Sequence, residues 1–225
     1  MAQPLNQCDI VLFDLDGTLT NPREGITRSV QFALQRLGID EPDLTALEHF
    51  IGPPLLQCFM SSYQLDEATA WQAVNHYRER FKDVGLYENQ LFDGIPQLLS
   101  LLNQQGRTLY MATRKPRVFA ERIAAHFGFA DQFKVMYGSE LDGTRTDKAE
   151  LIGYLLAQEG IDPERALMIG DRKHDLIGAR RHGVTNAAVE YGFGSAQELD
   201  EHKPDYRFAS VAALHQAFSQ APLRG

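Results

Sequence analysis

The chain has few of the residues that cross-link a protein. Its 225 residues include only two cysteines, Cys8 and Cys58. They are far apart in the sequence and stand in apolar surroundings, so we expect reduced, packed thiols rather than a disulfide or a metal pair. A chain of this length can bury roughly 70 to 75% of its unfolded surface, so its core needs no cross-link.

Long apolar runs are also missing. No stretch approaches the roughly 20 apolar residues that span a bilayer, and the first seven residues have neither a basic nor an apolar signal region. We therefore predict a cytoplasmic protein with no membrane partner. The net charge of −8 argues against non-specific binding to nucleic acid. An anionic substrate would need a local cation against this overall charge.

The chain is organised around residues 9–20. Ile10–Phe13 is a short apolar run without alternation, which predicts a strand buried on both faces. Asp14 and Asp16 follow it, and Gly17 supplies a turn. The C-terminal ends of strands are where open α/β sheets bind ligands. An isolated pair of this kind is more often a simple strand-ending turn, so its meaning depends on the residues that follow.

Residues 21–90 contain no convincing strand. Helical periodicity predicts helices near residues 22–37, 43–50, 55–61 and 66–84, with a break at Ile51–Pro54. We predict a small all-helical domain over this segment. In its last helix the apolar face consists of Val74, Tyr77, Phe81 and Val84.

Several other side chains of that helix could suggest substrate binding. Trp71 and Tyr77 are expected to pack, and solvation is expected for the charged Arg78, Arg80 and Lys82.

From residue 91 onward, helices alternate with strands. Alternation of this kind implies right-handed βαβ units and a parallel sheet. The predicted fold is an α/β doubly wound parallel sheet built from residues 1–20 and 91–225, into which the helical domain 21–90 is inserted. The expected strands are 108–112, 133–137, 166–169, 186–189 and 206–208, and the expected helices are 95–105, 116–127, 147–158, 174–182 and 211–218.

Polar residues also follow the second predicted strand of this sheet. Thr113, Arg114 and Lys115 stand before a helix whose free N–H groups would attract an anion, which predicts a phosphate seat. Taken singly, Thr113 is more often a helix cap, and the two cations are more often solvated surface charges.

Lys148 stands in the first turn of another predicted helix. A cation there is unfavourable by about 0.3–1 kcal/mol against the helix dipole. The position therefore calls for a compensating anion, although solvated first-turn lysines are common.

The strand at 166–169 is followed by Asp171 and, four residues later, Asp175. Capping of the next helix is an equally good explanation for Asp175. Asp171 would add a third carboxylate to the edge that carries Asp14 and Asp16. Carboxylates at one edge repel one another unless a cation lies between them, and a site of oxygen ligands matches Mg²⁺.

These residues, taken in order, resemble the four motifs of the haloacid dehalogenase (HAD) superfamily: Asp14-Leu15-Asp16-Gly17-Thr18, then Thr113, Lys148 and Gly170-Asp171 with Asp175. The helical insert resembles the C1 cap of that family. Residues 14–26, 51–54 and 168–199 are most similar to the phosphoglycolate phosphatase-like and 5′-nucleotidase-like branch.

The resemblance implies a role for each residue of the motifs. Asp14 would be the nucleophile that forms an aspartyl phosphate, and Asp16 the general acid and base. Thr113 and Lys148 would bind the phosphoryl group, and Arg114 departs from the small polar residue usual there, so it either contacts an anion or faces solvent. Mg²⁺ would be held by the Asp14 and Asp171 carboxylates and the Asp16 main-chain carbonyl, with Asp175 supporting these ligands.

The implied activity is Mg²⁺-dependent hydrolysis of a small phosphorylated metabolite, of the phosphoglycolate or nucleoside 5′-monophosphate type. A phosphoglucomutase-type isomerase and a non-hydrolytic phospho-acceptor signalling module are the alternatives. His174 is the only histidine within a motif, and no catalytic role is assigned to it. The sequence predicts neither a particular ester nor an oligomeric state.

Overall fold

The computed structural model describes residues 2–223, and the chain forms two compact units. The first, here called the sheet unit, comprises Met1–Thr20 and Leu91–Gly225; the second, the helical unit, comprises Asn21–Gln90. Among residues 2–223, no helix combines the length and the apolar character needed to cross a membrane. Both cysteines are buried and are not joined in a disulfide, as expected.

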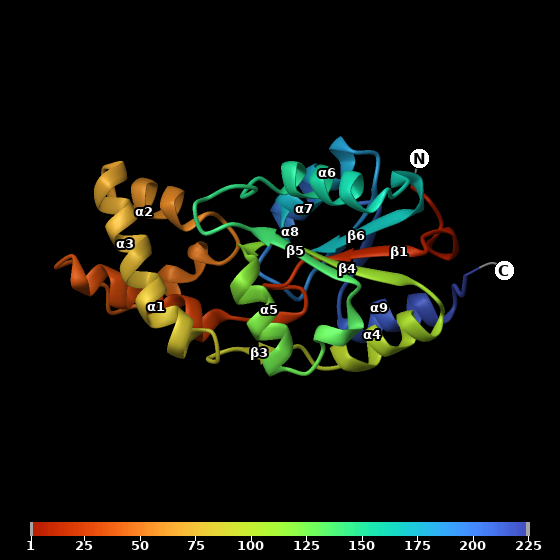
Figure 1. Ribbon diagram of the computed structural model, residues 1–225, viewed down its shortest axis with the longest axis horizontal. Helices are drawn as coiled ribbons and strands as arrows, with labels where there is room; N and C mark the ends of the chain where they lie inside the picture. Colours follow the sequence, from red (N-terminus) through yellow and green to blue (C-terminus); the bar gives the residue numbers. More distant parts are fainter. Residues whose placement is uncertain (1, 224–225) are drawn as a thin grey trace. The chain divides into compact units, whose positions relative to one another are not determined.

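The sheet unit contains a parallel six-stranded sheet in the order β5-β4-β1-β6-β7-β8, which confirms the predicted fold class (Figure 1). Its central strand β1 pairs with β4 on one side and β6 on the other, so that Phe13 lies opposite Met111 and Ile169. The strands are β1 (Ile10–Phe13), β4 (Thr108–Pro116), β5 (Val135–Ser139), β6 (Ala166–Gly170), β7 (Thr185–Val189) and β8 (Tyr206–Phe208).

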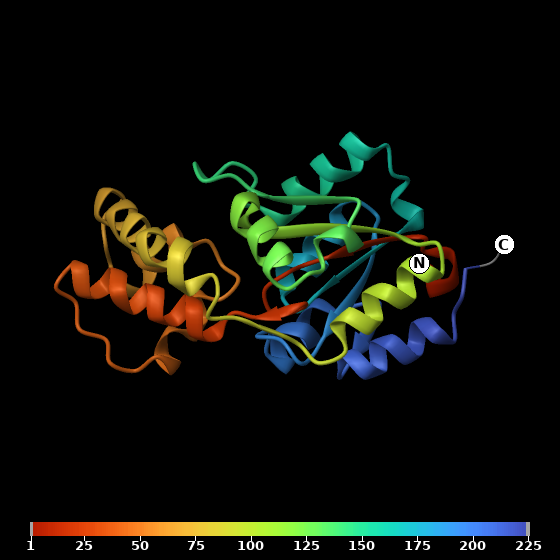
Figure 2. The same cartoon turned by 60° about the horizontal axis from the view of Figure 1, so that its bottom comes forward.

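Helices cover both faces of this sheet, as Figures 1 and 2 show. On one face, Leu151 and Ile152 of α6 pack with Leu12, Tyr110 and Met168 from the three central strands. Burial on both faces explains why these strands are apolar without alternation. The helices are α4 (Ile95–Gln104), α5 (Arg117–His126), α6 (Lys148–Glu159), α7 (Lys173–Arg181), α8 (Ala196–His202), which the sequence analysis did not predict, and α9 (Val211–Ser219).

The two ends of the chain are joined by Arg107, just before β4. Its guanidinium group is buried and donates hydrogen bonds to the main-chain carbonyls of Leu5, Cys8 and Ala221. It also lies 4.8 Å from the centre of the Phe218 ring in α9. One cation therefore holds the first residues of the sheet unit against its last helix.

The helical unit has an aromatic core. Phe50 contacts Phe59 with ring centres 4.9 Å apart, and Tyr77 stacks on Phe81 at 5.1 Å. The packing of Tyr77 agrees with the prediction. The elements are α1 (Arg23–Arg36), the 3-10 helix η2 (Thr45–Phe50), α2 (Leu55–Tyr63), α3 (Glu67–Arg80) and the π-helical turn η3 (Phe81–Gly85).

Two expectations about the end of α3 are wrong. The π-helical turn η3 adds a residue per turn, so Val84 leaves the apolar face and is 47% exposed. Arg80 is not simply solvated, because it forms an ion pair with Glu88 at 2.7 Å and donates to the Ser29 hydroxyl.

A two-stranded ribbon, also not predicted, marks the boundary between the units. Here β2 (Thr20–Asn21) pairs with β3 (Gln90–Leu91).

Candidate active site

Asp14 directly follows strand β1 and therefore lies at the C-terminal edge of the sheet. The Asp14 amide donates to the carbonyl of Ile169 in β6, and the Leu15 amide donates to Asp14 Oδ1 at 2.8 Å. The ion pair of Asp14 with Lys148 also uses Oδ1, and no side-chain hydrogen bond within residues 2–223 uses the other oxygen, Oδ2. The strand thus fixes one carboxylate oxygen and presents the second.

Gly17 brings the turn after Asp16 against the next carboxylate. Its φ is +82°, a conformation that side chains rarely adopt, and a Cβ there would lie 2.1 Å from Asp171 Oδ2. The glycine predicted as a simple bend is therefore required for the close approach of two parts of the site.

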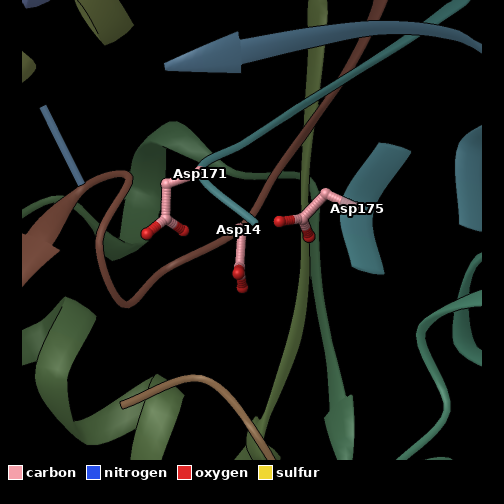
Figure 3. Close-up of side chains that lie close together, drawn as sticks. All are labelled: Asp14, Asp171 and Asp175. Atoms are coloured by element: carbon pink, nitrogen blue, oxygen red, sulfur yellow. The ribbon is translucent and has the colours of Figure 1, made fainter. Parts of the chain in front are cut away.

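Three carboxylates converge at this edge. Asp14, Asp171 and Asp175 each offer an oxygen within 4.8 Å of the others, and all three residues are buried (Figure 3). Burial, followed by the charges of Asp175 and Asp14, raises the pKa of Asp171 well above its usual range. These three acids, all of them among the four residues predicted for the metal site, could hold a metal ion.

Lys148 is the cation of the site and is 2% exposed. Its Nζ lies 3.1 Å from Asp14 Oδ1 and 2.8 Å from Asp175 Oδ1, and it donates to the Ala112 carbonyl at 2.6 Å. Burial opposes its charge, but the attraction of Asp14 and Asp175 prevails and raises the pKa of Lys148. The compensating anions that its helical position calls for are these two aspartates.

Asp175 caps its helix, which is one of the explanations weighed for it, and it also pairs with Lys148. Its Oδ2 accepts from the Arg172 amide at 3.1 Å, which caps α7, while Oδ1 pairs with Lys148. Both oxygens are thus engaged by the chain itself. Asp175 therefore helps to orient Lys148.

Asp16 forms an ion pair with Lys115, a residue for which the sequence left both a phosphate seat and a solvated surface position open. Lys115 is buried, and its Nζ lies 2.6 Å from Asp16 Oδ2. Of these two alternatives, the solvated position does not hold, because β4 continues to Pro116 and places Lys115 at the buried edge of the sheet. Burial raises the pKa of Asp16, an effect that Lys115 opposes.

Thr113 and Arg114 lie on the same extension of β4. Thr113 is buried, and its hydroxyl accepts a hydrogen bond from the Lys115 amide at 3.2 Å. Arg114 is half-buried, and its Nε donates to the carbonyl of Thr146, two residues before Lys148. The extension thus joins the second and third motifs.

A loop after β7 also contributes to the site, although no motif indicated it. The Phe193 amide donates to Asp171 Oδ2 at 2.7 Å, and the Tyr191 hydroxyl donates to the Thr18 carbonyl at 3.0 Å. The available signal was Tyr191-Gly192-Phe193-Gly194, two glycines around an aromatic residue at the end of a predicted strand.

The charges of the site suit a divalent cation. Asp14, Asp16, Asp171 and Asp175 bring four carboxyl groups to this edge, and the ion pairs that they form within residues 2–223 involve two ammonium groups, those of Lys115 and Lys148. The acids thus outnumber the lysines that pair with them, and oxygen donors bind hard divalent ions. The residues present therefore fit a metal ion.

The fold and site define a doubly wound α/β protein with paired acids and a lysine at its strand ends. A family model described as haloacid dehalogenase-like hydrolase matches residues 11–189. The chain belongs to this family, which confirms the resemblance and the expectation of an enzyme.

Three relatives show where the chain stands within the family. A 5′-nucleotidase from Pseudomonas aeruginosa is 68% identical over 92% of this chain and 93% of its own length. The tyrosine-protein kinase PtkA from Mycobacterium tuberculosis is 38% identical over 89% of this chain and 68% of its own. A phosphoglycolate phosphatase from Aliivibrio fischeri is 26% identical over 87% and 90%. The names of the first and third agree with the predicted branch.

A solved structure supports the same placement. The crystal structure of a predicted phosphatase from Clostridium acetobutylicum has a TM-score of 0.90 and 44% identity, and the match covers 94% of this chain and 98% of the other.

Proposed function

We propose that the protein is a Mg²⁺-dependent phosphatase that hydrolyses small-metabolite phosphomonoesters through an aspartyl phosphate on Asp14. Nucleoside 5′-monophosphates are the first candidate substrates, since the relative at 68% identity is named a 5′-nucleotidase. Phosphoglycolate is the second. The observation that carries the proposal is the position of Asp14, with one oxygen held by Lys148 and Leu15 and the other available for attack.

Two groups of the chain act on the phosphoryl transfer. Asp14 Oδ2 attacks phosphorus, the bond from phosphorus to the ester oxygen breaks, and its electron pair passes to the leaving oxygen. Asp16 supplies a proton to that oxygen and later removes a proton from the water that hydrolyses the intermediate. Its carboxyl group suits this role because burial favours the protonated form.

The remaining residues bind and orient. Lys148 neutralises phosphoryl charge, and the Thr113 hydroxyl bonds a phosphoryl oxygen. Arg114 adds positive charge beside them. Mg²⁺, held by the Asp14 and Asp171 carboxylates and the Asp16 carbonyl, would supply charge stabilisation for the phosphoryl oxygens. Asp175 and the Phe193 amide fix Lys148 and Asp171 in place.

The test is a panel of phosphate esters that includes nucleoside 5′-monophosphates, 2-phosphoglycolate and sugar phosphates, each with and without Mg²⁺. We expect release of free phosphate that requires Mg²⁺ and no bisphosphate activator. Dependence on a sugar bisphosphate, with isomerised sugar phosphate as the product, would instead indicate a mutase. A phosphorylated protein that persists for minutes while no ester is hydrolysed would indicate a phospho-acceptor module.

A further inference from the structure

Lys115 is outside the motifs that the family resemblance covers, yet its backbone is tightly held. Its amide donates to the Thr113 hydroxyl, and the Ser139 hydroxyl donates to the neighbouring Arg114 carbonyl at 2.8 Å. The pairing of β4 with β5 shifts register between Ala112 and Pro116. A Cβ on Gly138 would lie 2.6 Å from the Lys115 carbonyl oxygen, so β5 can approach Lys115 only because residue 138 is glycine.

The side chain of Lys115 reaches the carboxyl group of Asp16, which is part of the proposed machinery. Its Nζ lies 2.6 Å from Asp16 Oδ2, and both side chains are about nine-tenths buried or more. Asp16 Oδ1 is also buried, and it has no hydrogen-bond partner within residues 2–223. Leaving a buried carboxyl oxygen unsatisfied is costly, so Oδ1 calls for a partner that the described residues do not supply.

We propose that Lys115 is a positioning residue that holds Asp16 Oδ2 and so presents Oδ1 to the leaving oxygen of the substrate. This inference rests on the proposed function. When the bond from phosphorus to the ester oxygen breaks, its electron pair stays on that oxygen, which takes the proton from Oδ1, while the bond from phosphorus to Asp14 forms. Lys115 touches none of the transferred groups and loses no proton.

Asp16 needs such a partner because the terminal torsion of its carboxyl group rotates easily. The terminal torsion of an aspartate is broad and nearly two-fold, so an unheld carboxyl group rotates and exchanges its two oxygens. A misplacement of about 1 Å can cost roughly 10²-fold in rate. A donor fixed on Oδ2 removes this freedom at the moment of proton transfer.

The experiment compares two esters with leaving groups of different basicity in wild type and Lys115→Met, which keeps the length of the side chain without its donor. A nucleoside 5′-monophosphate leaves as an alkoxide that needs a proton, whereas p-nitrophenyl phosphate leaves as a stable phenolate. We expect Lys115→Met to lower kcat/KM for the nucleotide by about 10- to 100-fold and for the nitrophenyl ester by less than about 3-fold. The ratio kcat/KM is used because it includes only the steps up to departure of the leaving group.

A double-mutant cycle separates positioning from a general structural role. In an Asp16→Ala background, Lys115→Met should lower kcat/KM for the nucleotide no further, because Lys115 acts only through Asp16. Arg117→Met is the matched control: Arg117 is an exposed cation two residues away that pairs with Glu121 at the surface. It should leave both esters unaffected.

Three outcomes would overturn the inference: an equal loss for both esters, an unchanged nucleotide rate, or additive losses in the cycle. Each of these would leave the proposed phosphatase intact, because the wild-type enzyme would still hydrolyse both esters. A wild-type protein that hydrolyses neither ester would overturn the proposed function, and this inference with it.

Discussion

The two units differ in how deeply they bury charged side chains. The sheet unit buries charged groups at one sheet edge, where Lys148 and Asp175 have side chains no more than 2% exposed. In the helical unit a typical ion pair, Arg28 with Glu24, has side chains that are 47% and 56% exposed. The interior of the helical unit is aromatic instead, as in the contact between Phe50 and Phe59.

This difference indicates where the chemistry takes place. Removing charges from water costs several kcal/mol per ion unless each is well paired, whereas exposed pairs contribute about 0–1 kcal/mol and constrain little. A buried cluster with excess negative charge is therefore poor as a stabilising device, and its retention fits a role in binding a cation and a phosphate. Substitutions should affect turnover in the sheet unit and stability in the helical unit.

The largest effect is expected for Asp14→Asn in the sheet unit. Loss of the nucleophile should lower kcat by at least about 10⁴-fold, because phosphoryl transfer has no other acceptor in the site. Asp131→Asn, at an exposed position of the same unit, is the control and should retain the wild-type rate. The measurement is phosphate release from the best ester of the panel. Comparable rates in wild type and Asp14→Asn would exclude Asp14 as the nucleophile.

Asp16→Asn should have the next largest effect. The amide keeps the shape of the side chain but cannot transfer a proton, so we expect a loss of about 10²- to 10⁴-fold, the usual contribution of a general acid or base. Steady-state phosphate release provides the measurement. A wild-type rate would remove Asp16 from the mechanism.

In the helical unit the sharpest change is Phe50→Ala. Phe50 is 1% exposed, and removing a buried phenyl ring typically costs about 3–5 kcal/mol. Urea denaturation with limited proteolysis of the segment 21–90 should show this loss. Met60→Ala, at a partly exposed position in α2 of the same unit, should cost far less. Equal stability of Phe50→Ala and wild type would contradict the packing described for this unit.

The smallest predicted effect is a dependence of stability on pH and divalent cation. The pKa of Asp171 in the folded chain is raised by burial and by neighbouring acids, so the folded state binds more protons than the unfolded state above pH ~4. Stability of the cation-free protein should therefore fall as pH rises through the raised pKa of Asp171. Mg²⁺ at about 100 times its Kd should restore about 2.7 kcal/mol near neutral pH.

Thermal unfolding at pH 5 and pH 7.5, with and without Mg²⁺, measures this effect. Asp171→Asn should weaken both the pH response and the Mg²⁺ response. A Tm that Mg²⁺ leaves unchanged at both pH values would argue against a cation site at this edge.

The sequence predicted the parts of the site that local patterns encode. Strand β1 is an uninterrupted apolar run, so the position of Asp14 at its end followed directly. Lys148 was indicated by the electrostatic cost of its place in the first turn of a helix. The parallel sheet then brought these residues together, as the alternation of elements implied.

The features that the sequence did not predict depend on tertiary contacts. The sequence could not decide between a buried and a surface position for Lys115. The choice depends on the continuation of β4 past Ala112 with a register shift. The hydrogen bond from the Phe193 amide to Asp171 could not be predicted, because a backbone N–H group is present at almost every residue and no side chain marks this one. Val84 fits the helical period and leaves the core only because a π-helical turn interrupts α3.

Arg107 gives the order of synthesis a physical consequence. Two of its acceptors, the carbonyls of Leu5 and Cys8, are made before it, whereas the third, that of Ala221, is made 114 residues after it. Until the ribosome releases that segment, a buried guanidinium group lacks one of its partners beside the strand that carries Asp14. We therefore expect the sheet unit to reach its final packing only after α9 and Ala221 have been made, and a truncation before α9 should yield a protein that is impaired far from the missing residues.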